Sequence, residues 1–404
     1  MPRYDITIVG GGLVGLTLAI ALEPALRAGA RLTLIDPAPQ PESKAPRSPS
    51  FDDRATALSA YSQRAYQRLN VWPLLEPYAS PIRWIEVSDR GHLGYHRMDA
   101  ADLDNDFGAV VANANLGLGL WQRARELDGM DWRFGDSVAA ISPGQDAQSL
   151  TLASGESIES RLVILCDGGR SPLATKVGLS AQQTDYHCWA RIATVRTSEP
   201  HNGRAYERFT EQGPIALLPF GDYSALVWTL PEAQRLRVDA MNAEQQLDWL
   251  NTAFGQRLGR ITEIGTAFDY PLVRRELIDP VRPRLLALGN AAATLHPVAG
   301  QGFNLAIRGL MRAAEVLNQA AVSNQDPGDI HLLHPLADAI ANDQRLTATF
   351  SDRLVRTFAS ANPLLRLGRN LGLNMLDRHP RLSHSFVLAS MGLSQGAPLP
   401  ETVS

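Results

Sequence analysis

The first 36 residues carry a glycine-rich turn between two short apolar runs. Residues 4–9 read as a buried strand, Gly10-Gly11-Gly12-Leu13-Val14-Gly15 follows, and residues 16–28 have the composition of a helix. The next apolar run, 31–35, ends in Asp36. A G-x-G-x-x-G turn inside a strand–helix–strand unit, with an acid about 20 residues further on, is typical of dinucleotide-binding folds. The sequence therefore predicts a Rossmann-like α/β domain that begins at the N-terminus.

Each residue of this fingerprint has a physical task. Gly10 makes the tight turn, Gly12 lets a pyrophosphate approach the backbone, and Gly15 lets the helix pack closely on the strand. Asp36 can hold the hydroxyl pair of a ribose. These four residues are the first candidate cofactor-binding residues.

Another glycine-centred turn, the last of three along the chain, spans residues 288–304, after the apolar run 285–288. Gly289 lets the backbone turn close to a ligand, and Asn290 follows it with a polar side chain. Gly300-Gln301-Gly302 then opens a helix that contains Asn304 in its first turn. The free N–H groups of such a helix start favour negative charge.

Two further stretches add candidate ligand contacts. The apolar run 157–165 ends in Cys166-Asp167-Gly168-Gly169, where a carboxylate and two glycines follow a buried strand. Arg54 comes just before a segment that we expect to enter a helix and continue to about residue 69. Its guanidinium can pair with Asp52 or Asp53, or reach a phosphate or ribose of a cofactor.

Composition excludes several classes of function. The 404 residues carry a net charge of -4 and no basic stripe, so nothing favours nucleic acid. Cys166 and Cys188 form no C-x-x-C pair, and the nine histidines show no metal-ligand spacing, so we expect no metal site. There is no uninterrupted apolar run of about 18 residues, so no transmembrane helix is predicted. A cytoplasmic protein fits these features.

The remainder of the chain predicts a second lobe and a helical end. Residues 185–230 have the pattern of an antiparallel sheet, whereas the chain beyond Asn304 is mostly helical. We expect a mixed α/β fold with three parts. A discontinuous cofactor-binding domain comprises 1–72, 100–180 and 270–330, a substrate-binding β-sheet domain comprises 73–99 and 181–269, and a C-terminal helical region comprises 331–404.

Three glycine-centred turns in one chain indicate a ligand long enough to touch several strand ends, and FAD meets this description. With these motifs the sequence resembles the FAD-dependent aromatic hydroxylases related to p-hydroxybenzoate hydroxylase. Within that group it is most similar to the ubiquinone-biosynthesis hydroxylases. Gly10 to Gly15, Asp167-Gly168 and Gly289 to Asn304 match the family's motifs. Asn290, and Pro172-Leu173-Ala174 after Ser171, resemble the branch that acts on 2-polyprenyl-6-methoxyphenol.

The resemblance implies an activity and a set of roles. NAD(P)H would reduce FAD, the reduced flavin would react with O2 to a C4a-hydroperoxide, and an electron-rich phenol would take up the distal oxygen. Pro297 and the 298–302 backbone, Gly300 included, would wall the flavin ring and exclude water. His296 has a structural role or a direct acid–base role, and both remain open. The cofactor-binding set becomes Gly10, Gly12, Gly15, Asp36, Arg54, Asp167, Gly168, Gly289, Asn290, Gly300, Gln301, Gly302 and Asn304.

The resemblance also implies partners. A polyprenyl tail demands an apolar path, which we expect the sheet of residues 185–230 to line. It also demands access to a membrane, so peripheral contact at its inner face and membership of a ubiquinone-pathway protein complex are further expectations. Other readings stay open: hydroxylation at another ring position, a soluble aromatic substrate, or a non-catalytic FAD-fold scaffold. An NAD-dependent dehydrogenase would leave the turns at Asp167 and Gly302 unexplained.

Overall fold

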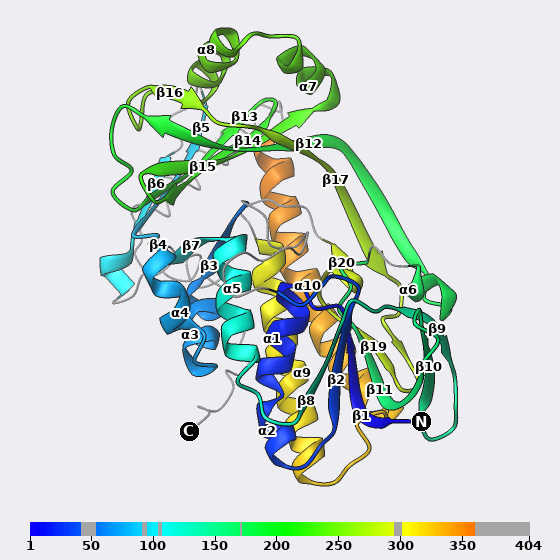
Figure 1. Cartoon of the computed structure of the whole chain (residues 1–404). Coiled ribbons are helices and arrows are strands. Elements are labelled where there is room, and N and C mark those ends of the chain that lie inside the picture. The colour runs from blue at the N-terminus through cyan, green and yellow to red at the C-terminus, as the bar shows by residue number, and fades with distance from the viewer. Residues whose placement is uncertain (42–53, 91–94, 104–106, 170–171, 295–300, 360–404) are drawn as a thin grey trace.

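The computed structural model describes residues 1–41, 54–90, 95–103, 107–169, 172–294 and 301–359. Two large sheets dominate it, and Figure 1 shows them at opposite ends of the molecule, joined by the long strands β12 and β17. The mixed α/β fold expected from the sequence is confirmed.

The first sheet has a parallel centre. Its strands follow the order β18-β19-β11-β1-β2-β8, with β19, β11, β1, β2 and β8 parallel and β9–β10 attached to β11 as antiparallel strands. Ile6, Ile8 and Leu34 are at most 2% exposed because helices cover one face and smaller elements the other. The strands are β1 (Arg3–Val9), β2 (Leu32–Asp36), β8 (Met130–Phe134), β9 (Val138–Ser142), β10 (Gln148–Leu152), β11 (Ser157–Leu165), β18 (Val281–Arg282) and β19 (Leu285–Ala287).

Most helices of this half form one layer on one face of the sheet, whereas the short α6 packs on the other face beside β9. The helical run expected over 16–28 is divided into α1 and α2, since Pro24 starts a new helix more readily than it continues one. α1, α5 and α9 share a core with β1 and β2 that includes Leu16, Leu120 and Leu310. The helices are α1 (Leu13–Ala21), α2 (Glu23–Arg27), α3 (Ala60–Arg68), α4 (Trp72–Leu75), α5 (Asn113–Ala124), α6 (Leu173–Lys176), α9 (Gln301–Val322) and α10 (Ile330–Ala359), with 3-10 turns η1 (Glu76–Tyr78), η2 (Ala100–Leu103) and η3 (Gly289–Ala291).

The helix expected to continue to about residue 69 is present as α3, but it begins later than expected. The segment after Arg54 does not enter a helix directly, because Ala55–Ser59 forms strand β3. β3 pairs antiparallel with β7 (Gly108–Ala112), which also pairs with β4 (Ser80–Pro81). α3 starts only afterwards, with Ser59 as its N-cap. The helix was predicted because Ala and Leu fit a helix as well as a strand, and the strand depends on a partner about fifty residues away.

The second sheet is antiparallel apart from one pair. Its order is β20-β17-β12-β15-β14-β13-β5-β6, with β16 also paired to β12 and only β13–β5 parallel within the described residues. α7 (Glu232–Asp239) and α8 (Ala243–Phe254) cover its outer face, where Leu217, Leu226 and Trp228 are buried. The strands are β5 (Trp84–Asp89), β6 (Tyr95–Asp99), β12 (Ala181–Thr197), β13 (Arg204–Thr210), β14 (Gly213–Phe220), β15 (Tyr223–Pro231), β16 (Ile261–Ile264), β17 (Phe268–Leu277) and β20 (Ala293–Thr294).

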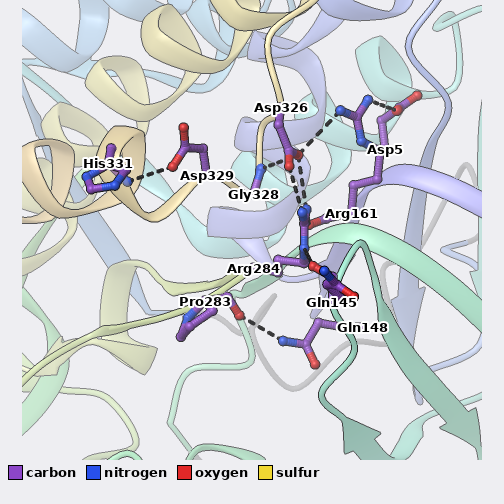
Figure 2. Close-up of polar contacts among 10 residues, drawn as sticks. All are labelled: Asp5, Gln145, Gln148, Arg161, Pro283, Arg284, Asp326, Gly328, Asp329 and His331. Atoms are coloured by element: carbon purple, nitrogen blue, oxygen red, sulfur yellow. Dashed lines mark hydrogen bonds and ion pairs between the residues drawn. The ribbon is translucent and has the colours of Figure 1, made fainter.

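An ionic network fixes the α9–α10 connection to the base of the parallel sheet. Figure 2 shows the Asp326 carboxylate accepting hydrogen bonds from Arg284 Nη1 and Nη2, at 3.0 and 2.7 Å, and from the Gly328 N–H at 3.1 Å. Arg161 joins the network through Asp326, with an Nη2–Oδ1 distance of 3.4 Å, and its Nη1 donates to Asp5 Oδ1 at 3.0 Å. These contacts lie at the end of the sheet opposite to the glycine turns and hold strands from both ends of the chain together.

The division into three domains stays a prediction.

Within the described residues, none of the helices combines the length and the apolarity that crossing a bilayer requires.

Candidate functional site

The three glycine turns lie at one edge of the parallel sheet. In the strand register, Val9 of β1 is opposite Leu165 of β11, and Leu165 is opposite Ala287 of β19. Neighbouring parallel strands therefore end at the same level, and each continues directly into a turn. The carboxyl edge of a parallel sheet is where ligands bind in open α/β folds.

The first turn has no room for larger side chains. Gly10 has a φ of +109°, and a Cβ there would lie 2.7 Å from the Cys166 carbonyl. A Cβ on Gly15 would lie 1.8 Å from the Gly10 oxygen, so only glycine lets α1 begin this close to β1. Gly12 caps α1, and no side chain caps the helix start. The N–H groups there are available to an anionic ligand.

Asp36 closes the first turn from the next strand. Its carboxylate accepts hydrogen bonds from the Gly11 N–H at 2.5 Å and from the Ala38 N–H at 2.8 Å. The side chain is half-buried at the end of β2. A carboxylate has about four acceptor positions, so two remain for ribose hydroxyls.

The second turn, formed by residues 167–169, lies against both the first and the third. Asp167 Oδ1 accepts a hydrogen bond from the Gly169 N–H at 3.1 Å, which holds the carboxylate over its own turn. Gly168 and Gly169 have φ values of +74° and +70°, a conformation that favours glycine. A Cβ on Gly169 would lie 2.9 Å from the Asn290 carbonyl oxygen. Burial, reinforced by the charge of Asp167, raises the pKa of the Cys166 thiol, so this cysteine is not a reactive thiolate.

The third turn, which begins at Gly289, packs against the helix that follows the first turn. Gly289 has a φ of +57°, and a Cβ there would lie 2.9 Å from Val14 Cγ1 in α1. The Asn290 side chain is exposed. The three turns thus form a continuous backbone surface at one sheet edge, which suits a ligand with several polar groups along its length.

Arg54 lies between the two halves of the protein. Its guanidinium carbon is 4.9 Å from the centre of the Tyr270 ring, which belongs to β17 of the second sheet. Its carbonyl oxygen accepts a hydrogen bond from the Asn113 N–H at 2.8 Å. Asp52 and Asp53, the ion-pair partners considered from the sequence, lie outside the described residues.

The Asn304 side chain is buried and makes hydrogen bonds to β3 and the start of α3. It is 7% exposed, and its Oδ1 accepts hydrogen bonds from the Ser59 N–H and the Ser62 hydroxyl at 2.8 and 2.7 Å. Its Nδ2 donates to the Ala57 carbonyl at 2.8 Å. Its proposed contact with the cofactor stays a prediction.

The rest of the third motif is described only in part. α9 begins at Gln301, as predicted, and a Cβ on Gly302 would meet no atom within 4 Å. His296, Pro297 and Gly300 lie outside the described residues, so the flavin-ring wall stays a prediction.

Sequence reasoning missed a carboxylate in the second sheet. Glu207 of β13 is half-buried on the face opposite to α7 and α8, and burial raises its pKa to about 7. Alternation along β13 places Glu207 on the same face as Ala205 and Phe209. That signal was present in the sequence, but which face the helices cover is decided by the tertiary structure.

The comparisons with known proteins agree on one family. A family model described as an FAD binding domain matches residues 3–328. The ubiquinone hydroxylase UbiL of Rhodospirillum rubrum is 32% identical, over 98% of this chain and 91% of its own. The 3-demethoxyubiquinol 3-hydroxylase of Escherichia coli is 30% identical, over 96% of this chain and 98% of its own. The mouse ubiquinone biosynthesis monooxygenase COQ6 is 26% identical, over 92% of this chain and 87% of its own.

Solved structures share the fold at lower sequence identity. The p-nitrophenol 4-monooxygenase PnpA of Pseudomonas putida superposes with a TM-score of 0.79 at 17% identity, covering 98% of this chain and all of its own. PqsL of Pseudomonas aeruginosa, solved with 2-aminobenzoylacetate, gives a TM-score of 0.68 at 20% identity, covering 86% of this chain and 96% of its own. At these identities the structures establish the architecture.

Proposed function

Because the chain belongs to the FAD-binding-domain family and is an FAD-dependent aromatic monooxygenase, we propose that it hydroxylates the ring of a polyprenyl phenol in ubiquinone biosynthesis. NAD(P)H supplies the electrons and O2 the oxygen atom. The net reaction converts the phenol, O2, NAD(P)H and a proton into the hydroxylated phenol, water and NAD(P)+. The observation that carries the substrate class is the near full-length similarity to hydroxylases whose names place them in this pathway.

The glycine-turn surface fits FAD. Gly10 and Gly15 leave no room for a Cβ, whereas Gly302 faces open space, so the backbone at the first and third turns is shaped for close approach. Gly10, Gly12 and the uncapped start of α1 would hold the pyrophosphate, and Asp36 the adenosine ribose. Flavin supplies the redox chemistry when bound, and the protein supplies position and electrostatics.

The remaining cofactor contacts are assigned by position. Asp167 and Gly168 at the second turn, with Gly289 and Asn290 at the third, would bind the ribityl chain. Gln301, Gly302 and the start of α9 would stabilise negative charge on the flavin ring through the helix dipole. Arg54 would reach a phosphate or ribose from the side of Tyr270.

We place the substrate ring between the glycine turns and the second sheet. This sheet presents an apolar face toward the first half of the protein, and several of its side chains are only half-buried, including Ile192, Leu218 and Val227. By contrast, the face under α7 and α8 is fully buried at Leu217, Leu226 and Trp228. Accessible apolar side chains inside a two-lobed protein suit an aromatic ring with a hydrocarbon tail.

The leading substrate is 2-polyprenyl-6-methoxyphenol, and the runner-up is a sister intermediate hydroxylated at another carbon. The similarity to the 3-demethoxyubiquinol 3-hydroxylase supports the runner-up, whereas Asn290 and the sequence after Ser171 support the first. A polyprenyl tail partitions into bilayers, so we further propose that the protein works at the inner membrane face, beside other enzymes of the pathway.

The test combines cofactor, turnover and product. The purified protein should be yellow, and its NAD(P)H oxidation in air should rise with a short-chain 2-prenyl-6-methoxyphenol and yield a hydroxylated ring. The same assay with a short-chain demethoxyubiquinol distinguishes the two ring positions by product mass and NMR. A folded protein that takes up no FAD would contradict the enzyme. A yellow protein that makes only H2O2 with both phenols would contradict the substrate class.

A further inference from the structure

The inner face of the second sheet, defined as the face opposite to α7 and α8, carries one row of paired residues across its middle. From β12 to β6 the strand register joins Ile192, Val227, Ala216, Glu207, Val87 and His96, one from each successive strand. Cross-strand partners share a face. The neighbouring row includes Ala205, Leu218 and Ile85, which belong to the apolar cluster beneath the sheet. Glu207 is therefore a carboxyl in an apolar setting.

The surroundings of this carboxyl are apolar as far as the structure describes them. Within the described part of the chain, Glu207 takes part in no hydrogen bond or ion pair, although Arg204 and Arg208 lie on the same strand. Those arginines alternate onto the outer face, where Arg208 Nε donates to the Ala253 carbonyl of α8 at 3.2 Å. The described ionisable groups that share the inner face on the neighbouring strands are Asp89 of β5 and His96 of β6.

An unpaired carboxyl in apolar surroundings costs stability, so its presence calls for a function. Glu207 is only half-buried, and so are Val87 and Val227 in the same row. The helix α10 also packs on β13 and β14 from this side. Beside it, the Glu207 carboxyl keeps part of its surface accessible on the face where we place the substrate ring. Burial raises its pKa to about 7, which leaves a large share of the basic form at neutral pH.

We propose that Glu207 is the group that accepts the phenolic proton of the substrate; this inference rests on the proposed function. The O–H bond of the phenol breaks, the proton moves to a carboxylate oxygen of Glu207, and the electron pair stays on the phenol oxygen. The resulting phenolate is a more electron-rich ring and attacks an electrophilic oxygen faster. A base with a pKa near the working pH is suited to this transfer, which contributes about 10²–10⁴-fold to a rate. Return of the proton to the product or to water restores the carboxylate.

Glu207→Gln tests the proposal, because glutamine keeps the size of the side chain and removes the base. FAD content should stay unchanged, and the melting temperature should be equal or higher because a partnerless carboxyl is removed. Hydroxylation of the parent phenol should fall about 100-fold. NADPH oxidation should then yield mainly H2O2. Glu211→Gln is the matched control, since Glu211 is exposed in the hairpin that follows β13.

A substrate that is already ionised separates proton transfer from a structural role. Ring-fluorinated phenols lose their proton near neutral pH, so they need no base. We expect Glu207→Gln to hydroxylate a difluorinated short-chain phenol within about fivefold of the wild-type rate, whereas a merely structural role would slow both phenols equally. Glu207→Asp, which keeps a shorter carboxylate, should retain part of the activity on the parent phenol.

The outcomes are distinct. Equal losses on the two phenols, or no loss on either, would overturn the role of Glu207 while leaving the proposed function intact. A wild-type protein that hydroxylates neither phenol would overturn the proposed function and this inference with it. If Glu207→Gln does not fold, the same comparison of the two phenols is made with Glu207→Asp, where a smaller defect on the fluorinated phenol supports the proposal and an equal defect overturns it.

Discussion

Gly15 and Gly302 both stand in the first turn of a helix, yet the space around them differs. A Cβ on Gly15 would lie 1.8 Å from the Gly10 oxygen, whereas a Cβ on Gly302 would meet nothing within 4 Å. Gly15→Ala should therefore lower the free energy of unfolding of the apoprotein by about 3 kcal/mol through overpacking. Gly302→Ala should leave it unchanged or slightly higher, because alanine favours helix.

Urea unfolding of the two apoproteins checks this pair. An apoprotein with Gly15→Ala as stable as the wild type would refute the steric account of the first turn. FAD titration of Gly302→Ala adds a second readout, since reduced FAD affinity at unchanged stability would place the cofactor against the start of α9.

Asn304 gives a second prediction at the scale of one side chain. Its amide makes three hydrogen bonds to β3 and the start of α3, so Asn304→Ala should cost about 2–3 kcal/mol of unfolding free energy. Asn318, also in α9, is the control because its amide bonds to Ala25 N–H and Ala21 carbonyl, at 3.1 and 2.9 Å. If Asn304 serves only the fold, both variants unfold earlier and bind FAD normally. Weaker FAD binding in Asn304→Ala alone would restore its predicted ligand role.

These residues also show what sequence reasoning can reach. The glycine turns were predictable because their spacing is local and each glycine has a steric reason. Asn304 shares the same local motif, but its partners lie more than 240 positions earlier in the chain. No short-range pattern reports such contacts, and the same holds for the burial of Glu207.

At the scale of elements, a buried ion pair joins α9 to α10. Arg308 donates to Asp343 from Nε and Nη2, at 2.8 and 3.1 Å, and their side chains are 6% and 10% exposed. Asp343→Ala should cost about 3–5 kcal/mol because it leaves a buried, unpaired guanidinium. The double variant Arg308→Leu/Asp343→Leu should cost clearly less. Chemical unfolding of single and double variants measures the difference, and equal losses would contradict the desolvation argument.

The Asp326 network at the α9–α10 connection should make the free energy of unfolding depend on pH in the acid range. Burial alone would raise the pKa of Asp326, but hydrogen bonds from Arg284 and Gly328, with the charges of Arg284 and Arg161, outweigh it and lower the pKa. A lowered folded-state pKa gives stability that is present above the unfolded value of about 3.9 and lost as the pH falls through the folded value.

Asp326→Asn tests this linkage. At neutral pH it should lower the unfolding free energy by about 1 kcal/mol, a modest figure because the side chain is partly exposed and solvent screens the pair. The difference from the wild type should shrink as the pH falls below about 4 and vanish once Asp326 is protonated. Melting temperatures recorded across this range decide it, and a difference independent of pH would contradict the linkage.

Elements differ in how well the sequence predicted them. β1, α1 and β11 follow from long apolar or periodic runs that can be read locally. β3 was expected as helix, because its five residues have no strong preference and pairing with β7 decides their conformation. In such short segments, tertiary contacts decide the backbone conformation and intrinsic propensity does not.

At the scale of the whole molecule, the second sheet is assembled from separate stretches of chain. β5 and β6 come from residues 84–99, and β5 pairs in parallel with β13 at six positions from Arg204 to Phe209. A fragment of residues 181–277 keeps the strands around β12 but exposes the β13 edge and the apolar inner face. We expect it to lack a cooperative thermal transition and to aggregate. A fragment that melts cooperatively as a monomer would refute this dependence.

The fold class was predictable because the order of strands, turns and helices along the sequence carries it. How the two halves face one another was not, since it depends on side chains such as Arg54 over Tyr270, which lie far apart in the chain. The boundaries proposed from the sequence divide the chain at 181 and 270, and Figure 1 shows β12 and β17 running as continuous strands from one half of the molecule to the other.

The short strand β20 has a consequence for recombination between relatives. Ala293 and Thr294 lie within the third glycine turn, just after η3, and pair with Glu276 and Arg275 of β17. A chimera that imports the second sheet from another hydroxylase must therefore import the matching crossover after η3, or else the grafted sheet and the native turn will disagree in register. The segment to exchange between relatives therefore ends after Thr294, because β20 pairs with β17 of the second sheet.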